Sequence, residues 1–391
     1  MMKKILLLCV ALMAVSCIYP FTPEAVDGSG TLVIEGDILI GRTSVFNIGH
    51  TVPITNPEME PVHPSGKIWV ENDAGAIFDG FPDASKQGTY KIDTQHADPD
   101  KQYRLHFIND ENGKEYISNW ERVCGAPEID SLSYNINYEK AKLYVALSMH
   151  SRGESFFRWS YVEDWQYTSN FAAFIKFVVD VPTGRRRSGH LEYSDFIKEN
   201  TYTCYDHAVS TKILTFSTEK QTDDRFVDLE FLPIDQDDLR IQTLYRIVVD
   251  LEPLTKDAYL YWENIKSNSE YNGNLFAPNP SELVGNIRCV QDPDELVMGY
   301  VNVAQIARKQ LVIDDIDINF YKSSEPPIEV AELSERDYNE YYFEQYYLPY
   351  ATIYPPGDLT QTYWAPARCV DCVLMAGGTR QKPEDWPPQK D

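Results

Sequence analysis

Residues 103–118 read Tyr-Arg-Leu-His-Phe-Ile-Asn-Asp-Glu-Asn-Gly-Lys-Glu-Tyr-Ile-Ser, and the fold class can be argued from them. Tyr103, Leu105 and Phe107 alternate with polar residues, which is typical of a strand that buries one face. Asn112-Gly113 separates this strand from a second one over residues 114–118, and Asn-Gly is a preferred hairpin turn. The stretch therefore predicts an antiparallel β-hairpin.

The segments before this hairpin carry similar patterns. Residues 31–38 are rich in β-formers, and residues 67–71 alternate between polar and apolar. No long amphipathic helix interrupts residues 31–125, where short strands and turns follow one another regularly. We therefore expect an immunoglobulin-like β-sandwich over residues 31–125.

Residues 126–391 predict a larger, mostly antiparallel β domain. Alternating apolar residues indicate strands, which include residues 143–149, 157–161, 175–181 and 245–251. Thr255 is a suitable N-cap for a helix with an apolar stripe that reaches Ile265. Ser334 to Asp337 resembles a capping box that opens a helix over residues 338–347. The sequence thus predicts a mainly β fold with a few inserted helices.

The N-terminus resembles the signal of a bacterial lipoprotein. Two lysines precede an apolar run over residues 5–15, which is too short to span a membrane as a helix. Ala-Val-Ser-Cys at residues 14–17 resembles a lipobox, so we expect a signal peptide over residues 1–16 and lipid attachment at Cys17. Residues 17–30 would then form a lipidated tether. The alternative is an ordinary secreted protein, cut near Ser16, in which Cys17 is incidental.

The chain is strongly acidic, with a formal net charge of −25. Such a surface repels nucleic acid phosphates and anionic lipid headgroups, so we expect neither as a partner. The sequence contains no D-x-D-x-D-G calcium loop, and its histidines and cysteines lack the spacing of a zinc site. We therefore expect no metal and no cofactor.

Five of the seven cysteines remain once the signal is cut and Cys17 is lipidated. Disulfides form in the oxidising compartments outside the cytoplasm, and an odd count leaves at least one thiol unpaired. The Cys369-x-x-Cys372 motif lacks a second pair for zinc, and two glycines and a proline-rich tail follow it. We predict a structural disulfide here, either local or to Cys204.

Tyrosines crowd residues 338–364. Exposed aromatic rings stack on sugars and form protein contacts, so Tyr346, Tyr350 and Trp364 are candidate ligand contacts. The alternative is a face that packs inside the protein. We favour it, because helical spacing alone explains Tyr338, Tyr342 and Tyr346.

No pattern in the sequence indicates catalysis. G-x-S-x-G, H-E-x-x-H and G-x-G-x-x-G motifs are missing. Glu163-Asp164 and Asp235–Asp238 are carboxylate pairs that a glycosidase could use, but such pairs arise freely in a chain this acidic. Asp206, which lies beside a cysteine and a histidine, is a third acid that a hydrolase could use. We therefore expect a protein that is not an enzyme.

Several short motifs, none of them specific by itself, are spread along the chain. They lie at residues 31–36, 103–107, 113–116, 157–161, 254–262, 285–287, 299–300 and 369–386. Together they resemble a Bacteroidota lipoprotein family known as domain of unknown function 4249 (DUF4249). The resemblance implies an outer-membrane lipoprotein with an N-terminal immunoglobulin-like domain, often encoded beside a TonB-dependent receptor. It implies no catalytic residues.

The leading hypothesis is therefore an accessory binding lipoprotein at the outer membrane, facing the cell surface, that assists a TonB-dependent transporter in nutrient capture or uptake. Its ligand is not identified by the sequence. The second hypothesis is an adhesive or structural surface protein that binds glycans or proteins, and the third is a hydrolase.

Two features bear on which side of the membrane the protein faces. The first acid after Cys17 is Glu24, whereas related surface lipoproteins carry an acidic cluster directly after the lipidated cysteine. Asp130-Ser131-Leu132 resembles the O-glycosylation sequon of exported proteins in this phylum, which makes Ser131 a candidate modification site. A plain turn before a strand explains the same three residues.

Overall fold

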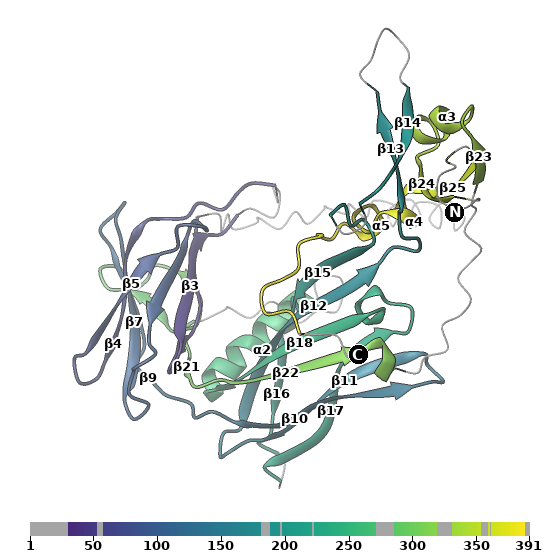
Figure 1. Ribbon diagram of the computed structural model, residues 1–391. Helices are drawn as coiled ribbons and strands as arrows, with labels where there is room; N and C mark the ends of the chain where they lie inside the picture. The colour runs from purple at the N-terminus through teal and green to yellow at the C-terminus, as the bar shows by residue number, and fades with distance from the viewer. Residues whose placement is uncertain are drawn as a thin grey trace, which may run out of the picture.

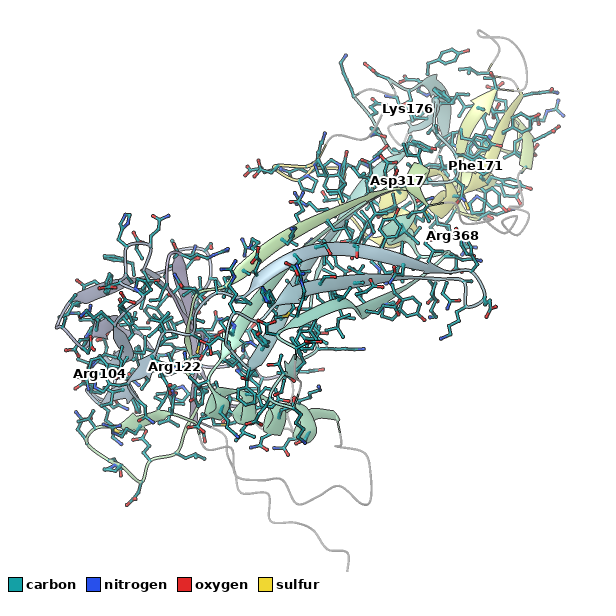
Figure 2. All side chains as sticks on the ribbon, turned by 90° about the horizontal axis from the view of Figure 1, so that it is seen from below. Arg104, Arg122, Phe171, Lys176, Asp317 and Arg368 are labelled. Carbon is teal, nitrogen blue, oxygen red and sulfur yellow. A yellow bond between two sulfur atoms is a disulfide. The ribbon has the colours of Figure 1, made fainter. Side chains whose placement is uncertain are left out.

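The computed structural model describes residues 30–52, 58–180, 188–195, 198–220, 223–270, 285–318, 331–352, 359 and 361–387. The protein is mainly β with few helices, as its sequence predicted. Figure 1 shows three lobes in a row, which we call the N-terminal sandwich, the central sandwich and the C-terminal lobe. Figure 2 shows Arg104 and Arg122 in the first lobe and Lys176 and Arg368 at the opposite end.

The N-terminal sandwich has the strand layout of an immunoglobulin-like fold, which confirms that prediction. One sheet contains β1 (Leu32–Glu35), β3 (Thr43–His50) and β6 (Thr89–Asp93). The other contains β4 (Gly66–Asn72), β7 (Gln102–Asn109), β8 (Glu115–Ser118) and β9 (Glu121–Arg122). β5 (Ile77–Pro82) pairs with both β4 and β6 and so joins the two sheets.

The predicted hairpin is the β7–β8 pair. Phe107 lies opposite Tyr116 in the antiparallel register, and both side chains are buried. The Asn112 side chain accepts a hydrogen bond from the Lys114 backbone N–H, at 2.9 Å, inside the connecting turn. The alternation read from the sequence therefore gives the correct buried face of this strand.

Residues 287–304 return to the N-terminal sandwich and complete it. β19 (Ile287–Cys289) pairs with β8, and β20 (Val297–Met298) pairs in parallel with β1. β21 (Val303–Ala304) pairs in parallel with β2 (Ile38–Leu39). Because β19 and β20 stand at the two ends of the strand order, the sheet nearly closes into a barrel. A boundary at residue 125 leaves these strands out, since each is too short to show an alternating pattern.

The central sandwich packs two antiparallel sheets face to face. The first contains β10 (Glu128–Asn137), β11 (Lys142–His150) and β17 (Arg225–Asp235). The second contains β12 (Phe156–Thr168), β15 (Thr203–Val209), β16 (Leu214–Ser217), β18 (Leu244–Leu254) and β22 (Ala307–Asp314). Val145 and Leu147 from one sheet meet Trp159, Ile247 and Val249 from the other in a single core. Short 3-10 turns, η1 (Leu239–Ile241) and η2 (Asp315–Asp317), flank β18 and β22.

The helix predicted after Thr255 is α2 (Lys256–Glu270). Its cap forms as expected, because the Thr255 hydroxyl accepts a hydrogen bond from the Ala258 backbone N–H at 3.3 Å. Ala258 and Tyr261 on one face of the helix pack with Leu254 and Tyr300. The helix thereby lies where the central sandwich meets the returning segment.

The second predicted helix is shorter than expected. α3 (Tyr338–Phe343) begins at the predicted residue, but Ser334 hydrogen-bonds the Asp337 carboxylate and no side chain caps the helix. Tyr346 adopts a left-handed φ of 56°, which a helix cannot continue. The predicted helix over residues 338–347 is therefore wrong in its last turn, where β24 (Tyr347–Thr352) begins.

The C-terminal lobe contains a hairpin, a three-stranded sheet and three short helices, the first of which is α3. The hairpin consists of β13 (Ile175–Val179) and β14 (Gly189–Tyr193), so the strand predicted near residue 175 belongs here and not to the central sheet. β23 (Ala331–Ser334) and β24 flank β25 (Gln361–Pro366). α4 (Ala367–Val370) and α5 (Cys372–Ala376) follow.

Candidate functional site

A buried ion cluster joins the N-terminal and central sandwiches. Arg158 on β12 forms ion pairs with Asp37, from the segment between β1 and β2, and with Glu252 on β18. Asn302 donates a hydrogen bond from its side chain to Glu252, at 2.9 Å, and one from its backbone to Asp37, at 3.0 Å. The Arg158 guanidinium also lies 4.2 Å from the centre of the Trp262 ring. These contacts connect four distant parts of the chain.

Two carboxylates share one guanidinium in this ion cluster. Burial raises the pKa of Glu252 to about 7; Arg158 opposes the increase, and the negative charge of Asp37 adds to it. Glu252 therefore carries a proton over much of the acidic range, which balances the cluster. At higher pH one negative charge is left without a partner.

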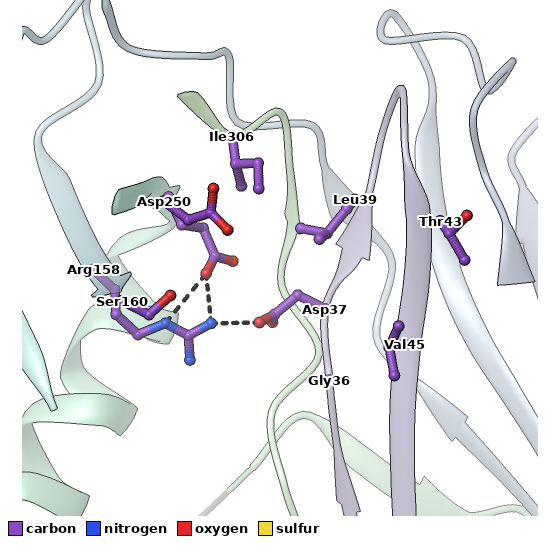
Figure 3. Close-up of a pocket in the computed structure, with 10 residues that line it drawn as sticks. Gly36, Asp37, Leu39, Thr43, Val45, Arg158, Ser160, Asp250 and Ile306 are labelled. Atoms are coloured by element: carbon purple, nitrogen blue, oxygen red, sulfur yellow. Dashed lines mark hydrogen bonds and ion pairs between the residues drawn. The ribbon is translucent and has the colours of Figure 1, made fainter. Parts of the chain in front are cut away.

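A pocket of about 210 Å³, the junction pocket, opens beside this cluster. Figure 3 shows Arg158 and Ser160 on one side of it and Asp37 and Leu39 on the other. The Asp37 and Arg158 charges that face each other across it are paired with one another. We therefore interpret the junction pocket as part of the contact between the two sandwiches.

A second pocket, the helix pocket, has a volume of about 440 Å³. It lies between α2, the β9 segment and the returning segment, and its lining includes Glu121, Asp257, Leu260, Tyr261, Asn286 and Tyr300. Pockets of this size at an interface between domains commonly hold small molecules. The lining combines carboxylates, amides and aromatic rings, which can bind a polar organic ligand.

Glu121 lies at the centre of the polar side of the helix pocket. Its Oε1 atom accepts hydrogen bonds from the Tyr300 hydroxyl, at 3.0 Å, and from the Asn286 amide, at 3.2 Å. Burial raises the pKa of Glu121, the two hydrogen bonds oppose this, and the nearby charge of Asp257 adds to the increase. The positive charge of Arg122 also lowers this pKa, but Glu121 forms no ion pair within the described part of the chain.

Sequence reasoning did not find the helix pocket, because its residues come from separate segments. Tyr261, Asn286 and Tyr300 do lie in motifs on which the family resemblance rests. The glycines of two of these motifs have a packing role. A Cβ on Gly285 would lie 1.8 Å from the Gly299 carbonyl oxygen, and one on Gly299 would lie 2.0 Å from that of Ile34.

The predicted hydrolase carboxylates do not converge on a site. Glu163 and Asp164 are neighbours on a strand, so their side chains point to opposite faces of the sheet. Glu163 is buried, where it accepts hydrogen bonds from Arg240 and Tyr245 at 2.9 and 2.7 Å. Asp164 pairs with Arg246, and Asp206 accepts a hydrogen bond from a neighbouring backbone N–H.

Cys204 and Cys372 form a disulfide. Cys369 is a buried free thiol, so of the two alternatives the bond to Cys204 is the one that forms. Cys124 and Cys289 are also free and buried, and burial raises the pKa of the Cys124 thiol to about 12. The disulfide fastens the C-terminal lobe to β15 of the central sandwich.

The three candidate aromatic contacts lie in different environments. Trp364 is fully buried against Phe177 and Tyr338, so its assignment as a ligand contact is wrong. Tyr350 is half-buried and stacks on Phe171, with ring centres 4.3 Å apart. Tyr346 is 75% exposed. Packing inside the lobe, the favoured alternative, accounts for the first two.

The remaining candidates are Ser131 and Cys17. Ser131 is exposed on β10, next to a bulge in the pairing with β11. Cys17, the signal over residues 1–16, Glu24 and the tether up to residue 29 lie outside the described residues. Within the described ranges, no helix is long and apolar enough to cross a membrane. The same ranges contain no group of three His, Cys, Asp or Glu side chains that could hold a metal ion.

The fold and the junction define a protein of two β-sandwiches that are fastened together by buried charges. The chain matches the family described as Domain of unknown function (DUF4249) over residues 18–310, and it belongs to that family. The match ends at residue 310, so it includes the β13–β14 hairpin of the C-terminal lobe but not the Cys369–Trp386 stretch, on which part of the resemblance rests. No curated protein matches the chain.

Proposed function

We propose that this chain is a lipid-anchored outer-membrane protein that binds a ligand without converting it and assists a TonB-dependent transporter in its uptake. The observation that carries the binding role is the helix pocket, a polar cavity of about 440 Å³ between the two sandwiches. The ion pairs of Glu163 and Asp164 add support, because carboxylates held in this way are poor acid–base catalysts.

The anchoring part of the proposal rests on the signal at residues 1–17 and on the relatives that the sequence resembles. Changing Cys17→Ser should release the protein from the membrane fraction, because its lipid attachment is lost. The conservative change Ser16→Ala should leave it there. Retention of the Cys17→Ser variant in washed membranes would show that no lipid anchor is needed.

The transport role is tested by purification of the epitope-tagged protein from detergent-solubilised outer membranes. We expect a TonB-dependent receptor to co-purify with it. A preparation that repeatedly lacks such a receptor would remove the transport role. Protease treatment of intact cells, followed by mass spectrometry, would then tell whether the protein faces outside or towards the periplasm.

An adhesive surface protein is the second candidate, and the exposure of Tyr346 favours it. In that case Tyr346→Ser should reduce binding to cells or glycan surfaces and leave the receptor preparation unchanged. The matched control is Tyr138→Ser, which removes another exposed tyrosine from a different lobe.

A further inference from the structure

One wall of the helix pocket is aromatic and apolar. The Tyr261 and Tyr300 rings lie with their centres 5.5 Å apart, and Leu260, which is 49% exposed, lies beside them. Leu260 and Tyr261 come from α2, whereas Tyr300 comes from the returning segment. Aromatic faces carry partial negative charge and attract organic cations.

The lining also includes a carboxylate that can accept further hydrogen bonds, Glu121, next to Tyr300. Only the Oε1 atom of Glu121 accepts hydrogen bonds from the described residues, and Oε2 receives none from them. A carboxylate oxygen that is partly withdrawn from water gains most from a charged hydrogen-bond donor. Asp257, in the first turn of α2, adds a second negative charge to the same pocket.

The basic side chains next to these carboxylates are already paired elsewhere. Arg122 binds both carboxylate oxygens of Glu154, each at 2.8 Å. Lys256 pairs with Glu219, also at 2.8 Å. Among the described residues, those that line the pocket include no lysine, arginine or histidine. The helix pocket is therefore negatively charged, and the nearby Arg122 acts on Glu121 only through its charge.

We propose that the helix pocket binds the ammonium group of a small organic amine, with Glu121 as the hydrogen-bond or ion-pair acceptor and Tyr261 and Tyr300 as the stacking wall. Leu260 contacts the apolar part of the ligand. This inference rests on the binding function proposed above and names its ligand class. The net charge of −25 favours the approach of a cation.

A metal ion fits the helix pocket less well than an amine. Calcium takes six to eight oxygen ligands around one point. No group of three acidic, histidine or cysteine side chains gathers in the described residues, whereas two tyrosines, each 7% exposed, are among the residues that line the pocket. Aromatic rings contribute to organic cation binding and are not ligands of hard metal ions.

The test compares charged probes with neutral probes of the same shape. Choline is matched by 3,3-dimethylbutan-1-ol, and 1,5-diaminopentane by 1,5-pentanediol. Calorimetric titration should give a Kd of about 1 mM or lower for at least one of the amines and no measurable binding of either alcohol. Equal binding of an amine and its alcohol, or no binding of both amines, would overturn the proposal. Binding of calcium alone would do the same.

Variants of the pocket identify the site. Glu121→Gln should weaken amine binding at least tenfold, and Asp257→Asn, at an exposed position, should weaken it less. Because Glu121 also holds Tyr300 and Asn286, a second variant leaves these hydrogen bonds intact: Leu260→Lys places an ammonium group at the exposed edge of the pocket. It should abolish amine binding, whereas Val227→Lys, at an exposed position on β17 that does not line the pocket, should not. Full affinity in both Glu121→Gln and Leu260→Lys would refute the assignment.

This test is independent of the one for transport. If a TonB-dependent receptor co-purifies but no amine binds, only the ligand class is wrong. If amines bind and no receptor is found, the pocket assignment stands and the transport role falls.

Discussion

Cys204 and Cys372 are separated by 168 positions in the sequence, yet a disulfide holds their Cα atoms 5.7 Å apart. Cys204 lies on β15 in the central sandwich, and Cys372 opens α5 in the C-terminal lobe. Tyr167 strengthens the same attachment, because its buried hydroxyl donates a hydrogen bond to the Cys372 carbonyl at 3.0 Å. The disulfide and this hydrogen bond together attach the C-terminal lobe to the central sandwich.

We expect Cys204→Ala with Cys372→Ala to lower the free energy of unfolding by about 2 to 5 kcal/mol, because a long covalent loop is lost. Urea unfolding followed by tryptophan fluorescence would measure the change. Cys369→Ala, which keeps the disulfide, is the control and should cost distinctly less. Equal stability of the two variants would mean that the bond contributes little.

The ion cluster predicts a large difference between two arginines of the same sheet. Arg158→Met should destabilise the protein by about 3 to 5 kcal/mol, because Asp37 and Glu252 remain buried without their partner. Arg308→Met breaks the half-exposed pair with Asp250 and should cost less than about 1 kcal/mol. Thermal unfolding of both variants tests this order, and similar costs would contradict it.

The protonation of Glu252 predicts a pH dependence. Its pKa is about 7 in the folded protein and near 4.5 for an ordinary glutamate, so the folded state holds one more proton between these values. The contribution of Glu252 to the free energy of unfolding is therefore fully present below about pH 4.5. It is lost as the pH rises towards 7, by at most about 1.4 kcal/mol per pH unit. Glu252→Gln should remove this component of the slope, which denaturant titrations from pH 5 to 8 would detect. The exposed Glu335→Gln should keep the wild-type profile.

The C-terminal aromatics predict opposite outcomes for two substitutions. Trp364→Ala should cost about 3 to 5 kcal/mol, because it empties a buried site and removes the hydrogen bond to Thr362. Tyr346→Gly should preserve or increase stability, because glycine adopts the left-handed φ without strain. Circular dichroism melts of both variants check the prediction, and a loss at Tyr346→Gly would reveal a structural role for that ring.

Local sequence patterns predicted the strands and helices correctly where these elements are long. The β7–β8 hairpin and the Thr255 cap follow from a few neighbouring residues, and both are present. The helix over 338–347 ended early because Tyr346 adopts a left-handed conformation that no helical pattern reveals. Strands of two or three residues, such as β19 and β20, are too short to show an alternation of apolar and polar residues.

Local sequence patterns could not predict the helix pocket, for a related reason. Glu121, Asp257 and Tyr300 meet only because the chain returns to the N-terminal sandwich after α2. Acids that are adjacent in the sequence do not form a site here. Glu163 and Asp164 point to opposite faces of the same strand and have different partners. Tertiary contacts, and not sequence neighbours, build this pocket.

The return of residues 287–304 also sets an order of events during synthesis. The chain is made from its N-terminus, so β1 and β8 emerge long before β19 and β20. Until those late strands arrive, two sheet edges stay open and can pair with other chains. A chaperone that shields these edges would therefore be needed most while the central sandwich is still emerging, and a fragment that stops at residue 125 should aggregate.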